Sequence, residues 1–132
     1  MAAVPEAYLD LVTTKAPLAH LATIMKDGSP QVTPIWFDYT DGLIRVNSAK
    51  GRVKSRNMAE GAKVALSIVD PANGYRYIQI RGTVTKVTEE GGDAHIDSLA
   101  KKYLGLDAYP YRSAAEVRLI FEITPASVQV MG

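Results

Sequence analysis

The chain has 132 residues, of which 47% are hydrophobic and 22% charged, so one domain with a packed core is expected rather than a disordered polypeptide. It contains no cysteine, which excludes a disulfide scaffold, a thiolate metal site and a cysteine nucleophile, and which fits a cytoplasmic protein. The formal net charge is only +1 and no apolar run approaches the ~18 residues of a membrane span, so a membrane protein is not indicated.

The first fifty residues predict a short helix followed by three antiparallel strands. The three strand patterns are separated by two Asp-Gly dipeptides, which are typical of tight hairpins. Pro34 lies inside the second strand, and because proline cannot donate to a ladder it indicates an edge or a bulge there. The predicted helix covers residues 4–14, and the predicted strands cover 18–26, 30–39 and 43–49.

The remainder of the chain predicts two further helices and three further strands. Gly82 interrupts the longest of these strands and indicates a bulge or bend. Because the helices do not alternate strictly with the strands, the pattern favours a small closed or split antiparallel barrel over a doubly wound parallel sheet. The predicted helices cover residues 51–61 and 92–105, and the predicted strands cover 63–70, 75–88 and 117–130.

Positive charge is concentrated on one turn of this otherwise nearly neutral chain. Between residues 45 and 63 there are six cations and one anion, a local net charge of +5, whereas the remaining residues together carry −4. If a helix begins near Arg52, its first turn already holds the positive end of the helix dipole, and each cation placed there is disfavoured by ~0.3–1 kcal/mol. Such a repeated conflict with a local rule is typical of a binding site.

Two interpretations of this basic turn stay open on the residues alone. It is either a solvated basic face or an anion site, in which backbone N–H groups and charged side chains hold a phosphate. Ser48 and Ser55 would add hydroxyl donors, and Gly51 would allow the backbone to approach a ligand closely. The turn contains neither GxxxxGK[ST] nor GxGxxG, so the pattern predicts a phosphate or polyanion and nothing narrower.

Other candidate residues are weaker. The only histidines, His20 and His95, are expected to be a half-buried strand residue and a helix-surface residue, and two histidines cannot form a metal cluster by their spacing, so no metal is predicted. Trp36, the only tryptophan, fits core or dimer packing as well as a role in ligand stacking. Tyr75 and Tyr77 flank a cation and fit either a ring-binding site or the closed end of a barrel.

Two long segments carry a family resemblance. The stretch "HLATIMKDGSPQVTPIWFDYTDGLIRVNSAKGRVKSRNM", followed by "KVALSIVDPANGYRYIQIRGTV", resembles the pyridoxamine-5′-phosphate-oxidase-like split-barrel superfamily. More narrowly it resembles its actinobacterial branch of deazaflavin-dependent oxidoreductases, which use coenzyme F420. The resemblance spans nearly the full chain and implies a mainly β fold, a six-stranded antiparallel split β-barrel with short helices. It also implies a single cofactor-binding domain over residues 1–132 and a homodimer with two equivalent cofactor sites across its interface.

The resemblance also assigns roles to individual residues. The cofactor phosphate would be held by Ser48, Arg52 and Lys54, with Arg56 and Asn57 nearby, and Lys50 would meet the oligoglutamate tail. The residues that would line the tricyclic ring are Thr33, Pro34, Ile35 and Trp36. Two tyrosines, Tyr75 and Tyr77, would come from the partner subunit.

The implied activity is hydride transfer from C5 of reduced F420 to a conjugated, electron-poor small molecule. No acid–base residue is supplied by the resemblance or visible in the sequence, so the proton could come from water. Alternatives are an FMN-binding split-barrel oxidoreductase and a cofactor-binding protein without turnover. Nucleic-acid binding is disfavoured, because the chain has a pI near 7.9 and a net negative charge outside the basic turn.

Overall fold

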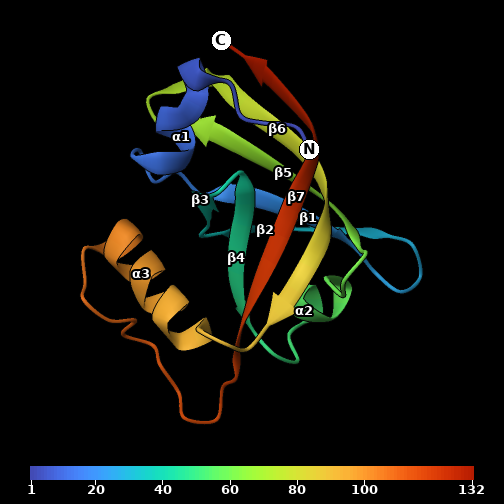
Figure 1. Ribbon diagram of the computed structural model, residues 1–132, viewed down its shortest axis with the longest axis vertical. Helices are drawn as coiled ribbons and strands as arrows, with labels where there is room; N and C mark the ends of the chain where they lie inside the picture. The colour runs from blue at the N-terminus through green and yellow to red at the C-terminus, as the bar shows by residue number, and fades with distance from the viewer.

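The computed structural model describes all 132 residues and consists of one antiparallel sheet with short helices (Figure 1). The strand order is β2-β1-β5-β6-β7-β4-β3. None of the helices is both long enough and apolar enough to cross a bilayer. The strands are β1 Ala19–Ile24, β2 Pro30–Ile35, β3 Asp38–Thr40, β4 Leu43–Ala49, β5 Lys63–Asp70, β6 Asn73–Thr88 and β7 Arg118–Met131. The helices are the 3-10 turn η1 Glu6–Tyr8, α1 Leu9–Thr13, α2 Val53–Asn57 and α3 Gly92–Leu104.

The strand predicted at residues 30–39 is two strands, so the sheet has seven strands rather than six. β2 pairs with β1 at one edge of the sheet and β3 pairs with β4 at the other. Only Trp36 and Phe37 join β2 to β3, and two residues bridge no more than roughly 10 Å between flanking Cα atoms. The two edges must therefore curl toward each other, which makes the sheet a split barrel.

The break between β2 and β3 is held by side chains of α3. Lys102 Nζ donates to the Phe37 carbonyl at 2.7 Å, and the Phe37 N–H points to Tyr103 Oη at 3.4 Å. Tyr103 in turn donates to the Pro17 carbonyl at 2.7 Å. The backbone of Phe37, whose side chain is fully buried, is thus satisfied by a helix instead of by a neighbouring strand.

Both Asp-Gly hairpins are confirmed, although they lie at opposite edges of the sheet rather than in one three-stranded meander. Asp41 and Gly42 have φ values of 54° and 79°, as a two-residue hairpin turn with left-handed central residues requires. The bulge expected at Gly82 is also confirmed, since the β6–β7 register shifts between Arg81 and Gly82. A Cβ atom at Gly82 would lie 2.6 Å from the Thr124 carbonyl oxygen, so only glycine fits this approach.

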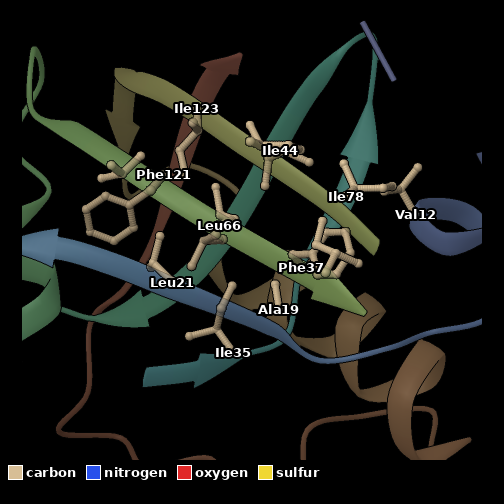
Figure 2. Packing of buried hydrophobic residues seen from close by; sticks show 14 of the residues in the cluster. Val12, Ala19, Leu21, Ile35, Phe37, Ile44, Leu66, Ile78, Phe121 and Ile123 are labelled. Atoms are coloured by element: carbon tan, nitrogen blue, oxygen red, sulfur yellow. The ribbon is translucent and has the colours of Figure 1, made fainter. Parts of the chain in front are cut away.

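The core fills the interior of the curled sheet. Figure 2 shows Leu21 of β1, Leu66 of β5, and Phe121 and Ile123 of β7 gathered in this interior. Ile78, Ile80 and Val84, which share one face of β6, are all fully buried. Val12 of α1 packs on the same cluster, so the N-terminal helix covers one end of the barrel.

A charged cluster fastens α1 to the turn between β5 and β6. Arg76 Nη2 lies 2.7 Å from Asp10 Oδ1, and Arg76 Nη1 lies 2.9 Å from Asp70 Oδ2. The Asp70 carboxylate is buried and also accepts from the Ala72 N–H and from Lys15. The Ala72 hydrogen bond, followed by that of Arg76, lowers the pKa of Asp70 to about 2.

We expect this cluster to make stability depend on pH at the acid end. Because the folded-state pKa of Asp70 is below its ordinary value of 3.8, its stabilising effect is complete above about pH 4 and is lost as the pH falls through about 2. Asp70→Asn should therefore lower the melting temperature at pH 7, and its deficit relative to wild type should shrink between pH 4 and 2. Asp107→Asn, which changes an exposed loop carboxylate, is the control. A deficit that stays constant down to pH 2 would contradict this account.

Candidate functional site

The basic turn follows β4 and leads directly into α2, but the helix is shorter than predicted. It begins at Val53 and has five residues, so Lys54 and Arg56 lie in its last turn as well as its first. The predicted conflict between these cations and the helix dipole is therefore wrong, because a one-turn helix has little dipole. Ser55 is also not a free donor, since its Oγ donates to the Ala49 carbonyl at 2.8 Å and fastens the turn.

The cations of the basic turn differ in their exposure and in their partners. Lys50 is exposed, and Arg52 is half exposed with Nη2 2.9 Å from Glu116 Oε2. Lys54 is half-buried, and burial, followed by the positive charges of Arg52 and Arg118, lowers its pKa. Arg52, Lys54 and Arg118 therefore lie close together, and positive charge exceeds negative charge in this region.

Lys54 borders an aromatic-walled hollow that also contains three residues predicted to contact a ring. The hollow has a volume of about 340 Å³ and lies between β2, β4, α3 and the loop that precedes β7. Trp36 forms part of its wall, stacked on Tyr103 with ring centroids 5.4 Å apart and edge-on to Tyr109 at 6.2 Å. The residues that line it are Leu18, Pro34, Ile35, Trp36, Asn47, Lys54, Ile96, Leu99, Tyr109 and Tyr111.

Three buried polar atoms near these elements have no hydrogen-bond partner. They are Thr33 Oγ1 on β2, Ser48 Oγ on β4 and Arg118 Nη1 on β7. A buried donor or acceptor without a partner costs about 1–3 kcal/mol, so such atoms are uncommon in folded proteins. Thr33 and Ser48 were both predicted to contact a cofactor, but these atoms are buried, and neither residue lines the hollow; nor do Lys50 and Arg52.

A buried polar network lies behind the hollow. Asn47 Oδ1 accepts from Arg118 Nε at 2.8 Å, and Asn47 Nδ2 lies 3.1 Å from His95 Nδ1. His95 Nε2 lies 2.6 Å from Asp38 Oδ2, and Arg45 Nε donates to Asp38 Oδ1 at 2.8 Å. Burial alone would raise the pKa of Asp38, but the hydrogen bonds from His95 and Arg45 outweigh it and lower the pKa to about 2.

This network corrects the expectations for the two histidines. His95 is buried rather than on the helix surface, and His20 is exposed rather than half-buried. Both ring nitrogens of His95 are engaged, so it orients Asn47 and Asp38 instead of exchanging protons with a ligand. Asp38 is likewise part of the network and not merely a turn residue.

The remaining predicted residues lie outside this hollow. Arg56 and Asn57 border a different one, of about 550 Å³, together with Met25 and Lys26. Asn57 Nδ2 donates to Thr23 Oγ1 at 3.0 Å, which ties α2 to β1. Tyr75 and Tyr77 lie at the opposite end of the sheet, beside α1, and Tyr75 is 80% exposed (Figure 1). One chain therefore does not bring these two tyrosines to the hollow.

Comparison with known proteins identifies the family of the chain. The family model described as pyridoxamine 5′-phosphate oxidase matches residues 4–132. The chain belongs to the pyridoxamine 5′-phosphate oxidase family. Among solved structures, an F420 reductase is 32% identical, with 96% of this chain and 98% of that chain covered and a TM-score of 0.81.

More distant members share the fold of this oxidase family. A protein described as a putative pyridoxamine 5′-phosphate oxidase from Listeria innocua is 13% identical, with 95% of both chains covered and a TM-score of 0.72. The FAD and heme binding protein from Mycobacterium smegmatis is 21% identical, with 96% of this chain and 71% of that chain covered and a TM-score of 0.67. A comparison with curated proteins found no match. The family includes oxidoreductases, and two of the relatives above are named for a flavin-type cofactor.

Several residues of the site in this family member were not found from the sequence. Tyr109 and Tyr111 were assigned only to a loop, and Arg118 and Asn47 only to strands. The available signal was composition: "AYPYR" places two aromatics in a segment that precedes a strand beginning with an arginine. The placement of Asn47, Tyr109 and Tyr111 around the hollow, with Arg118 beside Asn47, depends on tertiary contacts between β4, β7 and α3, which no local pattern contains.

Proposed function

We propose that this chain is an F420-dependent oxidoreductase that reduces a conjugated, electron-poor small molecule. The observation that carries the proposal is the position of Lys54, which lies close to the cations Arg52 and Arg118 and also borders the aromatic-walled hollow. A flat ring with a phosphate-bearing tail matches an apolar, aromatic-lined space beside positive charge. The similarity to an F420 reductase over 96% of the chain supports the same proposal.

Different residues would contact the phosphate, the tail and the ring of the cofactor. Arg52, Lys54 and the unpaired Ser48 hydroxyl would hold the phosphate, and exposed Lys50 is free to meet an anionic tail. The unpaired Thr33 hydroxyl, with Pro34, Ile35 and Trp36, would contact the ring. Arg56 and Asn57 would border the cofactor from the neighbouring hollow. Tyr75 and Tyr77 would complete the site from the second subunit of a homodimer.

When bound, the reduced deazaflavin supplies a hydride from C5 to an electrophilic atom of the substrate. The chain's own contribution is to orient the ring and the substrate and to exclude water from the hollow. The titratable side chains that line the hollow are those of Lys54, which the phosphate would engage, Tyr109 and Tyr111. The proton that completes the reduction would come from water, and none of the residues is assigned a catalytic role.

The decisive experiment is a fluorescence titration of the purified protein with F420 and with FMN. We expect F420 to bind more tightly, because Lys50 and the surplus positive charge suit a longer anionic tail. Lys54→Ala should weaken F420 binding by about tenfold or more, since a hydrogen bond to a charged group contributes ~1.5–3 kcal/mol. Lys101→Ala removes the same charge from an exposed position on α3, and should leave binding unchanged.

Equal or tighter binding of FMN would favour the alternative of an FMN-binding oxidoreductase. Tight binding of reduced F420 without oxidation of it by quinones, tetrapyrroles or conjugated enones would favour a cofactor-binding protein without turnover. Binding of neither cofactor would contradict both assignments.

The position of Trp36 allows a second test. Tyr103 already covers one face of the indole, so the ring is expected to border the cofactor with its other face or its edge. Saturation with F420 should quench the emission of this single tryptophan. Trp36→Phe retains an aromatic ring against Tyr103, so it should leave the melting temperature within a few degrees of wild type and weaken F420 binding. A clear loss of stability with unchanged binding would instead assign Trp36 to packing.

We also expect a homodimer. One reason is that Tyr75 and Tyr77 lie far from the hollow of their own chain. A second reason is that the outer face of β1, β5, β6 and β7 holds an exposed hollow of about 360 Å³. Small and apolar side chains line it, including Ala22, Ile24, Ala65 and Ala126. Analytical ultracentrifugation at micromolar concentration should show a dimer, and Tyr75→Ala should weaken F420 binding although Tyr75 lies far from the hollow of its own chain. A monomer with F420 bound would disprove this arrangement.

A further inference from the structure

Arg118 is a buried arginine at the first position of β7. It is only 7% exposed, its Nε donates to Asn47 Oδ1, and its Cζ lies 5.3 Å from the centre of the Tyr109 ring. Its Nη1, by contrast, is buried without a hydrogen-bond partner. The Nε atom and the face of the guanidinium are therefore fixed by Asn47 and Tyr109, whereas Nη1 has no hydrogen-bond partner.

Glu116 is the carboxylate that lies between Arg118 and Arg52, and Asp93 is a second carboxylate that borders the same small hollow as Arg118. Glu116 Oε2 accepts from Arg52 Nη2 at 2.9 Å, whereas Glu116 Oε1 is 3.6 Å from Arg118 Nη1, too far for a hydrogen bond. Its side chain is 24% exposed. The backbone beside it is fixed independently, because the Lys50 N–H donates to the Val117 carbonyl at 2.8 Å. The Glu116 side chain can therefore rotate into solvent without movement of the strand.

The charges around Glu116 do not balance. Arg52, Lys54 and Arg118 are close enough to influence one another, since the charges of both arginines lower the pKa of Lys54. Glu116 carries a single charge, pairs closely only with Arg52 and leaves Arg118 Nη1 without a hydrogen bond. A phosphate group offers at least two terminal oxygens, which is enough to accept from both arginines at once.

We infer that Arg118 is a further phosphate-binding residue and that Glu116 is an internal counter-ion, which leaves Arg52 when a phosphate group binds. The inference rests on the proposed function only in taking the ligand to carry a phosphate. Glu116 stabilises the ligand-free protein and lowers its phosphate affinity, because Arg52 must exchange one partner for another. A residue with a purely structural role would affect both properties in the same direction.

The test compares melting temperatures in sodium phosphate and in sodium chloride at equal ionic strength. In chloride, Glu116→Gln should melt below wild type, because two arginines lose their carboxylate. In phosphate it should gain more stability than wild type does. Asp107→Asn removes the same charge from an exposed position in the loop that precedes β7, and should behave like wild type. A phosphate gain for Glu116→Gln that is no larger than that of wild type, or an equal increase for Asp107→Asn, would overturn the inference.

Affinity measurements give the second readout. An ion pair as exposed as Arg52–Glu116 changes an equilibrium by about two- to fivefold, so Glu116→Gln should bind F420 or FMN tighter by that factor. Arg118→Gln should abolish most of the phosphate-specific gain in melting temperature, whereas Arg118→Lys should retain part of it. An undiminished phosphate gain in Arg118→Gln would remove Arg118 from the site. If neither F420 nor FMN binds to wild type, the proposed cofactor is wrong, while the response to inorganic phosphate still decides this inference.

Discussion

The capture of the Phe37 backbone by α3 is the constraint on which the rest of the structure depends. Without a neighbouring strand, the Phe37 N–H and carbonyl would be buried and unpaired, and Tyr103 and Lys102 meet them from the helix. That capture allows the chain to leave one edge of the sheet and enter the other within two residues. The same step places Pro34, Ile35 and Trp36 opposite β4 and next to α2, so closing the barrel also creates the aromatic-walled hollow.

Local patterns in the sequence were sufficient for the elements that local chemistry determines. The two Asp-Gly hairpins and the Gly82 bulge were predicted because turn dihedrals and glycine contacts act over a few residues. The break at Trp36 and Phe37 was missed, because the run from Pro30 to Tyr39 has no glycine and no proline after Pro34. What ends β2 is hydrogen bonding from a helix more than sixty residues away.

The candidate site divides in the same way. The basic turn and the Trp36 segment were identified from composition and resemblance, and the structure brings Lys54 next to Pro34, Ile35 and Trp36 in one hollow. The explanation by helix dipole was wrong, because α2 has only five residues, and its side chains tie it to β1 and β4. Arg118 and Glu116 were invisible, because an Arg and a Glu near the start of a strand are ordinary until β7 pairs with β4.

The candidate site lowers the free energy of unfolding of the ligand-free protein. Three buried polar atoms without partners, at about 1–3 kcal/mol each, are a large fraction of the 5–15 kcal/mol by which domains are usually stable. Apolar residues in place of Thr33 or Ser48 would remove part of this cost. A ligand that paired with the buried atoms would offset it, because binding only to the folded state stabilises that state by mass action. The local excess of cations in a nearly neutral chain fits the same proposal, since a bound anion would neutralise charge at this one place on the surface.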